Sequence, residues 1–299
     1  MKLSSSIEVR RARPLLGTIV EITVRGNNSV HLEEAIDVAF TTVAHVHRLM
    51  SFHDPLSDVS WINCHAFYKS ARVHPLTWHV LKCAQEFSRE SNGVFDITTA
   101  RQLVKWNYLP PLEAPLDNGS WRDIVLEDAC HVRFRRPVII DLGGIAKGFA
   151  VDRAVEALKH NGVEAGIVNA GGDLRTFGSS PQFIHLRHPG HPTRVAGAVR
   201  LRERAMATSG IYFRRRKYSG RYVSPLLHGR TRQSAREQIS VTVGAANCMT
   251  ADALTKVVFA LREEAAPLLA RYSADAVLLE QDGDPSWMFH PTCDASHQA

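Results

Sequence analysis

Residues 138–178 carry the sequence VIIDLGGIAKGFAVDRAVEALKHNGVEAGIVNAGGDLRTFG, which places two glycine pairs around one amphipathic segment. The apolar runs 138–140 and 167–168 each lead into such a pair, so we expect two strands that end in glycine turns. Between the turns, apolar residues recur at helical spacing at positions 150, 154, 155, 158 and 163, which predicts a helix. The segment therefore predicts the order strand, glycine turn, helix, strand and glycine turn.

Such a unit suits a phosphorylated ligand. Glycine allows a close approach of the backbone, and the N-terminus of a helix attracts anions. Lys147 stands at the start of the predicted helix, while Asp141 and Asp173 follow the apolar runs beside the glycines. The alternative is two ordinary tight turns in a mixed sheet, with the aspartates as turn caps. Both interpretations stay open at this stage.

Length and charge set broad limits. With 299 residues, 44% of them hydrophobic, the chain can bury a large core as one domain or as two intimately joined ones. The net charge of +6 suits an anionic partner. However, few aromatic residues interleave with the densest basic cluster, residues 214–217, which favours a solvated loop. We therefore expect no nucleic-acid partner.

The N-terminus lacks an apolar leader, and no stretch is long enough to span a membrane. These features predict a cytoplasmic protein. The five cysteines are widely spaced and include no C-x-x-C pair, which argues against a disulfide framework and a structural zinc site.

The remaining pattern is a mixture of strands and helices. It predicts a strand pair over 7–24, helices over 32–50, 75–91 and 248–272, and strands over 183–186, 196–201, 205–209, 239–245 and 276–279. We therefore predict an α+β fold with mixed β-sheets and packed helices, as one domain over 1–299 with two joined subdomains as the alternative. Residues 285–299 form a tail without a clear pattern.

Several polar residues outside the opening unit are further candidates. Asp252 lies early in the helix 248–272, where the dipole favours an acidic side chain that can also ligate a cation. Lys256 shares its helix face, and an ion pair worth about 0.2–0.5 kcal/mol is the alternative explanation. Asp96 can accept a hydrogen bond from a ligand or cap a turn. Ser209, in the sequence TSG, can donate its hydroxyl to a phosphate.

Seven segments, taken in order, resemble motifs of the ApbE family. They are RPLLGTIVEI (13–22), MSFHDPLSDVSWIN (50–63), GVFDIT (93–98), DLGGIAKGFAVDRA (141–154), VNAGGDL (168–174), ATSGIY (207–212) and ISVTVGAANCMTADAL (239–254). The order of so many motifs is far more specific than any one of them. The resemblance implies an ApbE-like, T-fold-like architecture.

The resemblance also implies a function. Members are FAD:protein FMN transferases, which split FAD at its pyrophosphate, release AMP and attach FMN to a threonine of an acceptor flavoprotein, with Mg²⁺ assisting. By motif position, the Gly144 carbonyl and the Asp252 carboxylate would ligate the metal. The implied flavin nucleotide site contains Leu16, Ser57, Asp58, Asp96, Lys147, Asp173 and Ser209. Asp252 and His228 are the implied catalytic residues.

Two positions depart from the family pattern. Lys256 stands where the family has its threonine metal ligand, and an ammonium group donates only and carries the same charge sign as the metal. In PLLHGRTR (225–232), Pro225 replaces the family's histidine and His228 replaces its aspartate. Proline cannot transfer a proton if that is the histidine's role. Magnesium dependence is therefore in question.

Three functions follow from this combination. The first is an active FMN transferase, and the second is a non-catalytic FAD-binding or interaction protein on the same scaffold. The third is an FAD pyrophosphatase, which splits FAD without an acceptor protein. As a hypothesis, the Lys256 ammonium occupies the space of the lost cation and pairs with Asp252.

Overall fold

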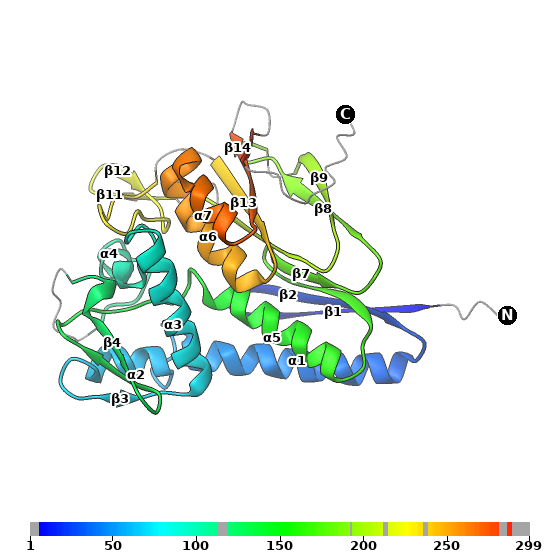
Figure 1. Cartoon of the computed structure of the whole chain (residues 1–299), viewed down its shortest axis with the longest axis horizontal. Helices are drawn as coiled ribbons and strands as arrows, with labels where there is room; N and C mark the ends of the chain where they lie inside the picture. Colours follow the sequence, from blue (N-terminus) through cyan, green and yellow to red (C-terminus); the bar gives the residue numbers. More distant parts are fainter. Residues whose placement is uncertain are drawn as a thin grey trace.

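The computed structural model describes residues 6–112, 119–191, 193–211, 215–235, 239–280 and 286–288. Its largest element is an eight-stranded sheet with the order β1-β2-β6-β7-β10-β13-β14-β15. These strands are β1 (Ile7–Leu15), β2 (Thr18–Gly26), β6 (Ala165–Ala170), β7 (Asp173–Phe177), β10 (Ala205–Gly210), β13 (Ile239–Ala245), β14 (Asp275–Glu280) and β15 (Ser286–Met288). Figure 1 shows the sheet beside a second, mainly helical part of the molecule.

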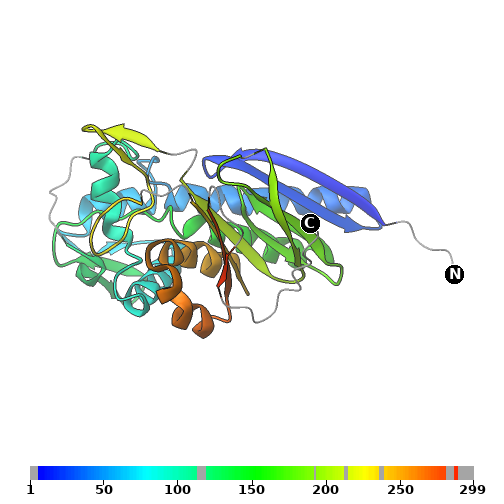
Figure 2. The same ribbon diagram turned by 90° about the horizontal axis from the view of Figure 1, so that it is seen from above.

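Helices cover one face of the sheet, and a hairpin covers part of the other. Helices α1 (Ser29–Met50) and α5 (Ala146–His160) pack against each other. Helix α1 covers β1 and β2, α5 covers β6 and β7, and α6 (Cys248–Leu261) packs on β10 and β13. Figure 2 shows the β1–β2 hairpin running along α1. On the other face, the hairpin of β8 (Gln182–Arg187) and β9 (Val195–Leu201) forms a small apolar cluster with Leu174, Met206 and Val277.

The second part lies at the left of Figure 1. It contains α2 (Asp58–His65), β3 (Ala71–Arg72), α3 (Pro75–Glu90), η1 (Ile97–Thr99), α4 (Ala100–Lys105), η2 (Trp121–Asp123), β4 (Ile124–Glu127), β5 (His131–Phe134), β11 (Arg216–Tyr218) and β12 (Arg221–Val223). One apolar cluster joins the two parts, because it includes Phe40 on α1 as well as Ile62 and Phe134. The division into one domain or two subdomains stays a prediction.

The α+β class is confirmed, but the sheets are not mixed. Every strand pair among the described residues is antiparallel. Hairpins cause much of this pairing, since β1 leads directly into β2 and β6 leads directly into β7. Antiparallel neighbours need only a short turn, whereas parallel neighbours need a long crossover.

The expected strand at 138–140 is absent, although Val138, Ile139 and Ile140 are buried. The side chain of Asn63 makes the hydrogen bonds that a neighbouring strand would make. Its amide nitrogen donates to the Ile140 carbonyl at 2.9 Å, and its oxygen accepts from the Ile140 amide at 2.8 Å. Since one side-chain amide supplies both a donor and an acceptor, the backbone groups of Ile140 are satisfied without a sheet.

The expected helix over 248–272 is interrupted. Arg262 adopts a φ of 56°, in the left-handed region, so α6 ends at Leu261. The short helices η3 (Arg262–Ala265) and α7 (Ala266–Arg271) follow. Of the tail 285–299, residues 286–288 form β15 against β14, and the rest lies outside the described residues.

No helix within the described ranges is both long enough and apolar enough to cross a membrane.

Candidate functional site

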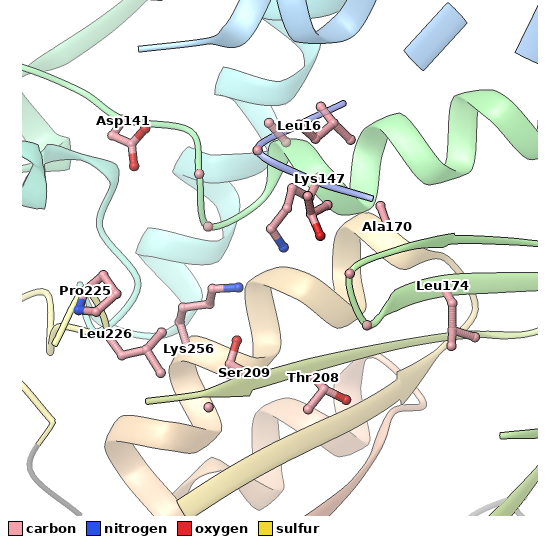
Figure 3. A pocket seen from close by; sticks show the side chains of 18 of the residues that line it. Leu16, Asp141, Lys147, Ala170, Leu174, Thr208, Ser209, Pro225, Leu226 and Lys256 are labelled. Carbon is pink, nitrogen blue, oxygen red and sulfur yellow. The ribbon is translucent and has the colours of Figure 1, made fainter. Parts of the chain in front are cut away.

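A pocket of about 1250 Å³ collects the glycine turns that the sequence singles out. Gly143 and Gly144, Gly171 and Gly172, and the hairpin turn between β1 and β2 all line it, as do Ser209 and Lys256. Figure 3 shows that Lys147 and Lys256 extend toward the same space, with Leu16 on one side and Thr208 and Ser209 on the other. Chain segments far apart in sequence therefore form one site.

The turn between β1 and β2 is a strained part of the pocket wall. Leu15 pairs with Thr18, which leaves a two-residue loop of Leu16 and Gly17 with φ values of 56° and 68°. Two positive φ values define a type I′ turn, which favours asparagine or glycine at both positions. A leucine here is unfavourable, and such strain is often kept at functional sites. It places Leu16 in the pocket wall.

The turn between β6 and β7 requires glycine. Gly171 and Gly172 have φ values of 64° and 103°. A Cβ atom on Gly171 would lie 2.4 Å from the Thr18 hydroxyl oxygen, so this turn lies directly against the β1–β2 turn. The close approach leaves the backbone of both turns available to a ligand.

Lys147 stands in the first turn of α5 and forms an ion pair with Asp173. Asp173 is only 1% exposed, and burial, followed by the nearby Asp252 carboxylate, raises its pKa. Burial by itself would lower the pKa of Lys147, but Asp173 and then Asp252 outweigh that effect and raise it. Lys147 therefore stays charged, and the Asp173 carboxylate is its counter-ion.

Asp252 lies on α6 and is fully buried. One carboxylate oxygen accepts the Lys256 ammonium, and the other accepts the Gly148 amide at 3.2 Å. Burial by itself would raise the pKa of Asp252, but Lys147 and then Lys256 outweigh it and lower it. The Thr255 hydroxyl donates to the Asp252 carbonyl at 2.7 Å and bonds the Ser209 hydroxyl at 2.8 Å.

The three positions implied as metal ligands do meet. A Cβ on Gly144 would lie 3.5 Å from the Cε of Lys256, which in turn binds Asp252. However, the Lys256 ammonium already pairs with the Asp252 carboxylate, which a metal ion would need as a ligand. Among the described residues, no group of three or more His, Cys, Asp or Glu side chains could hold a metal ion. The residues present do not fit Mg²⁺, which prefers several oxygen ligands.

Asp96 lines the pocket, but protein groups occupy its oxygens. It accepts the Thr98 amide at 2.8 Å, the Thr98 hydroxyl at 2.7 Å, the Trp121 amide at 3.3 Å and Arg232 at 3.1 Å. Burial raises the pKa of Asp96 against these interactions. Arg232 has a φ of 56°, in the left-handed region.

Ser57, Asp58 and His228 are not part of the pocket lining. Ser57 caps α2 and accepts the Ser60 amide at 3.0 Å. Asp58 accepts the His74 amide at 2.9 Å and so ties α2 to the start of α3. His228 accepts a local amide, and burial, followed by the charge of Arg230, lowers its pKa. A direct role in ligand binding or catalysis stays a prediction for these three residues.

Asp141 opens the motif at 141–154 and is a functional candidate to which the resemblance assigns no role. Three acidic side chains line the pocket. Glu21 pairs with Arg10 and Asp96 pairs with Arg232, whereas Asp141 forms no ion pair within the part of the chain that the structure describes. Burial raises its pKa, opposed by the Gly143 amide and His53. Its place after the apolar run 138–140, beside the glycines, was the available sequence signal.

Asp152 positions the start of α6. From α5, its carboxylate accepts the Cys248 amide at 2.9 Å and the Met249 amide at 2.8 Å. Arg175 on β7 pairs with the same carboxylate at 2.8 Å. Because these bonds fix the first turn of α6 against α5, they set the position of Asp252, four residues further on.

Fold and site together define an α+β protein with a large pocket, lined by two glycine turns and two lysines, beside an antiparallel sheet. The chain belongs to the ApbE family, whose pattern matches residues 16–278. The FAD:protein FMN transferase of Rhodobacter capsulatus is 27% identical over a match of 302 aligned positions, and this match covers 95% of this chain. The chain spans only 57% of the length of that relative.

Other relatives are of similar length. The FAD:protein FMN transferase of Klebsiella pneumoniae is 25% identical, and the match covers 85% of this chain and 84% of that protein. The crystal structure of the ApbE protein of Thermotoga maritima superposes with a TM-score of 0.84 at 28% identity, covering 94% of this chain and 97% of that one. The resemblance and the ApbE-like architecture are thereby confirmed.

Proposed function

We propose that this chain is an FAD:protein FMN transferase, which moves FMN from FAD to a threonine of an acceptor flavoprotein and releases AMP. One observation carries the proposal: two glycine turns of the family motifs line a single pocket together with Lys147 and Lys256. The relatives named FAD:protein FMN transferase support the same activity.

The pocket suits FAD in size and charge. Its volume of about 1250 Å³ exceeds the range of about 300–1,000 Å³ that small-molecule pockets usually occupy, which fits a dinucleotide. The backbone of the glycine turns can approach a pyrophosphate closely. Lys147 and Lys256 both extend into the pocket (Figure 3), where they can counter the negative charge of the pyrophosphate.

The reaction is a phosphoryl transfer. The oxygen of the acceptor threonine forms a bond to the phosphorus of the FMN half, and the bond from that phosphorus to the bridging oxygen breaks. AMP leaves with the electron pair. The two ammonium groups stabilise the charge that builds up on the phosphate oxygens. Asp141, as the pocket carboxylate outside the ion pairs described above, accepts the proton of the threonine hydroxyl.

The activity is tested by incubating the protein with FAD and a threonine-containing acceptor flavoprotein. We expect AMP and covalently bound flavin in equal amounts, measured by chromatography and by in-gel flavin fluorescence. An acceptor with the threonine changed to valine is the control, and it should stay unlabelled. AMP without labelling would instead identify an FAD pyrophosphatase, and bound FAD without AMP would identify a non-catalytic binding protein.

Asp141→Asn is expected to slow FMN transfer about 10²- to 10⁴-fold, the usual contribution of a general base, while FAD affinity is kept. In the native protein the rate should rise as pH increases through the pKa of Asp141, because only the carboxylate accepts a proton. Since that pKa is raised, the rise lies above the usual titration range of aspartate. Rates measured from pH 4 to 9 should lose this rise in the variant.

The matched control is Asp128→Asn, at an exposed position outside the pocket lining. It should keep the native rate and the native pH profile. A slow Asp141→Asn variant that retains the acid limb would exclude Asp141 as the base. The acceptor protein and the expected cytoplasmic location stay predictions.

A further inference from the structure

Lys256 is bound in the manner of a ligated cation. Its ammonium contacts the Asp252 carboxylate and also the Asp252 carbonyl oxygen, the latter at 3.0 Å. The side chain lines the pocket and is 16% exposed, while the Asp252 side chain is 0% exposed. One positive group therefore joins a buried carboxylate to the ligand space.

The charges around this point are balanced. Lys147 pairs with Asp173, and Lys256 pairs with Asp252, so the two lysines neutralise the two aspartates. In the absence of FAD, a divalent cation added beside them would leave two uncompensated positive charges in a largely buried cluster. Removing such charge from water costs several kcal/mol per ion unless it is paired. The cluster is thus complete without a metal.

Lys256 also lies close to Gly144, another position that the resemblance implies as a metal ligand. Its Cε lies 3.5 Å from the Cβ position of Gly144, whose loop lines the pocket beside the first turn of α5. From there, the fourth methylene of the lysine chain carries the charge toward the ligand space that Lys147 also enters (Figure 3). A threonine at this position would be too short to supply a charge.

We infer that the Lys256 ammonium replaces the divalent cation of the family, so that FAD binding to this chain needs no Mg²⁺. This inference rests on the proposed function, because FAD is the ligand. It concerns binding, and it can therefore be tested separately from FMN transfer.

The test measures FAD affinity by isothermal titration calorimetry, once with EDTA and once with excess Mg²⁺. For the native protein, the two dissociation constants should agree within about twofold. Lys256→Thr should bind FAD at least about tenfold more weakly in EDTA, and Mg²⁺ should restore most of that loss. Lys256→Arg keeps a cation, so its affinity should not depend on Mg²⁺. Lys82→Thr, at an exposed position on α3, is the matched control.

A native protein that binds FAD only with Mg²⁺ would overturn the inference, whether or not any variant folds. A Lys256→Thr variant that binds FAD as tightly as the native protein in EDTA would overturn it too. Tight binding in EDTA without AMP release would leave the inference standing and reject the proposed transferase. No binding under either condition would reject both.

Discussion

Lys147→Met is expected to lower the free energy of unfolding by about 3–5 kcal/mol, the usual cost of removing one partner from a buried ion pair. Asp173 is almost fully buried and accepts the Lys147 ammonium, so the variant leaves a carboxylate without its counter-ion. The nearby Asp252 charge makes this worse, because it already raises the pKa of Asp173. Urea denaturation followed by circular dichroism measures the loss.

The control for this prediction removes both charges. In Lys147→Met/Asp173→Asn no carboxylate is left unpaired, so stability should recover by several kcal/mol relative to the single variant. FAD affinity should stay low in both variants, because each lacks the ammonium in the pocket. Equal stability of the single and double variants would show that the pair does not carry the effect.

Gly148→Ala is expected to separate α5 from α6 and to disable the pocket. A Cβ at this position would lie 2.3 Å from the Cys248 carbonyl oxygen and 2.8 Å from the Met249 Cα. Both atoms are backbone, so the helices must move apart, at about 1–3 kcal/mol for overpacking. The same shift breaks the bond from the Gly148 amide to Asp252. Misplacement of about 1 Å can cost 10²-fold in rate, and we expect a loss of that size in FMN transfer.

Gly197→Ala is the matched control, because no atom lies within 4 Å of its added Cβ. It should keep its thermal midpoint and its transfer rate. Differential scanning fluorimetry and the AMP-release assay measure both variants. If Gly148→Ala behaves like this control, the close contact of α5 and α6 does not hold the site together.

Local patterns predicted most elements, because the relevant forces act over a few residues. The turn between β6 and β7 and the helix after Gly144 both follow from short-range rules. The strand predicted at 138–140 is wrong, because the backbone of Ile140 pairs with the side chain of Asn63, 77 residues away. The hydrophobic pattern within a segment carries no information about such a distant partner.

The candidate site divides in the same way. Gly144, Lys147 and Lys256, which the family resemblance singles out, all line the pocket, and their roles in binding stay predictions. Arg232 reaches Asp96 across 136 residues, and this contact had no local signal. Arg232 thereby binds an Asp96 oxygen that would otherwise be open to a ligand.

The residues that line the pocket extend from Leu16 to Lys256, so the pocket exists only when both ends of this span have come together. A ligand held there binds the folded chain and not the unfolded one. Binding then adds RT ln(1 + [L]/Kd) to the stability of the entire chain, about 2.7 kcal/mol at a hundredfold excess over Kd. The supply of ligand thus sets the fraction of molecules that are folded, as well as how often each one reacts.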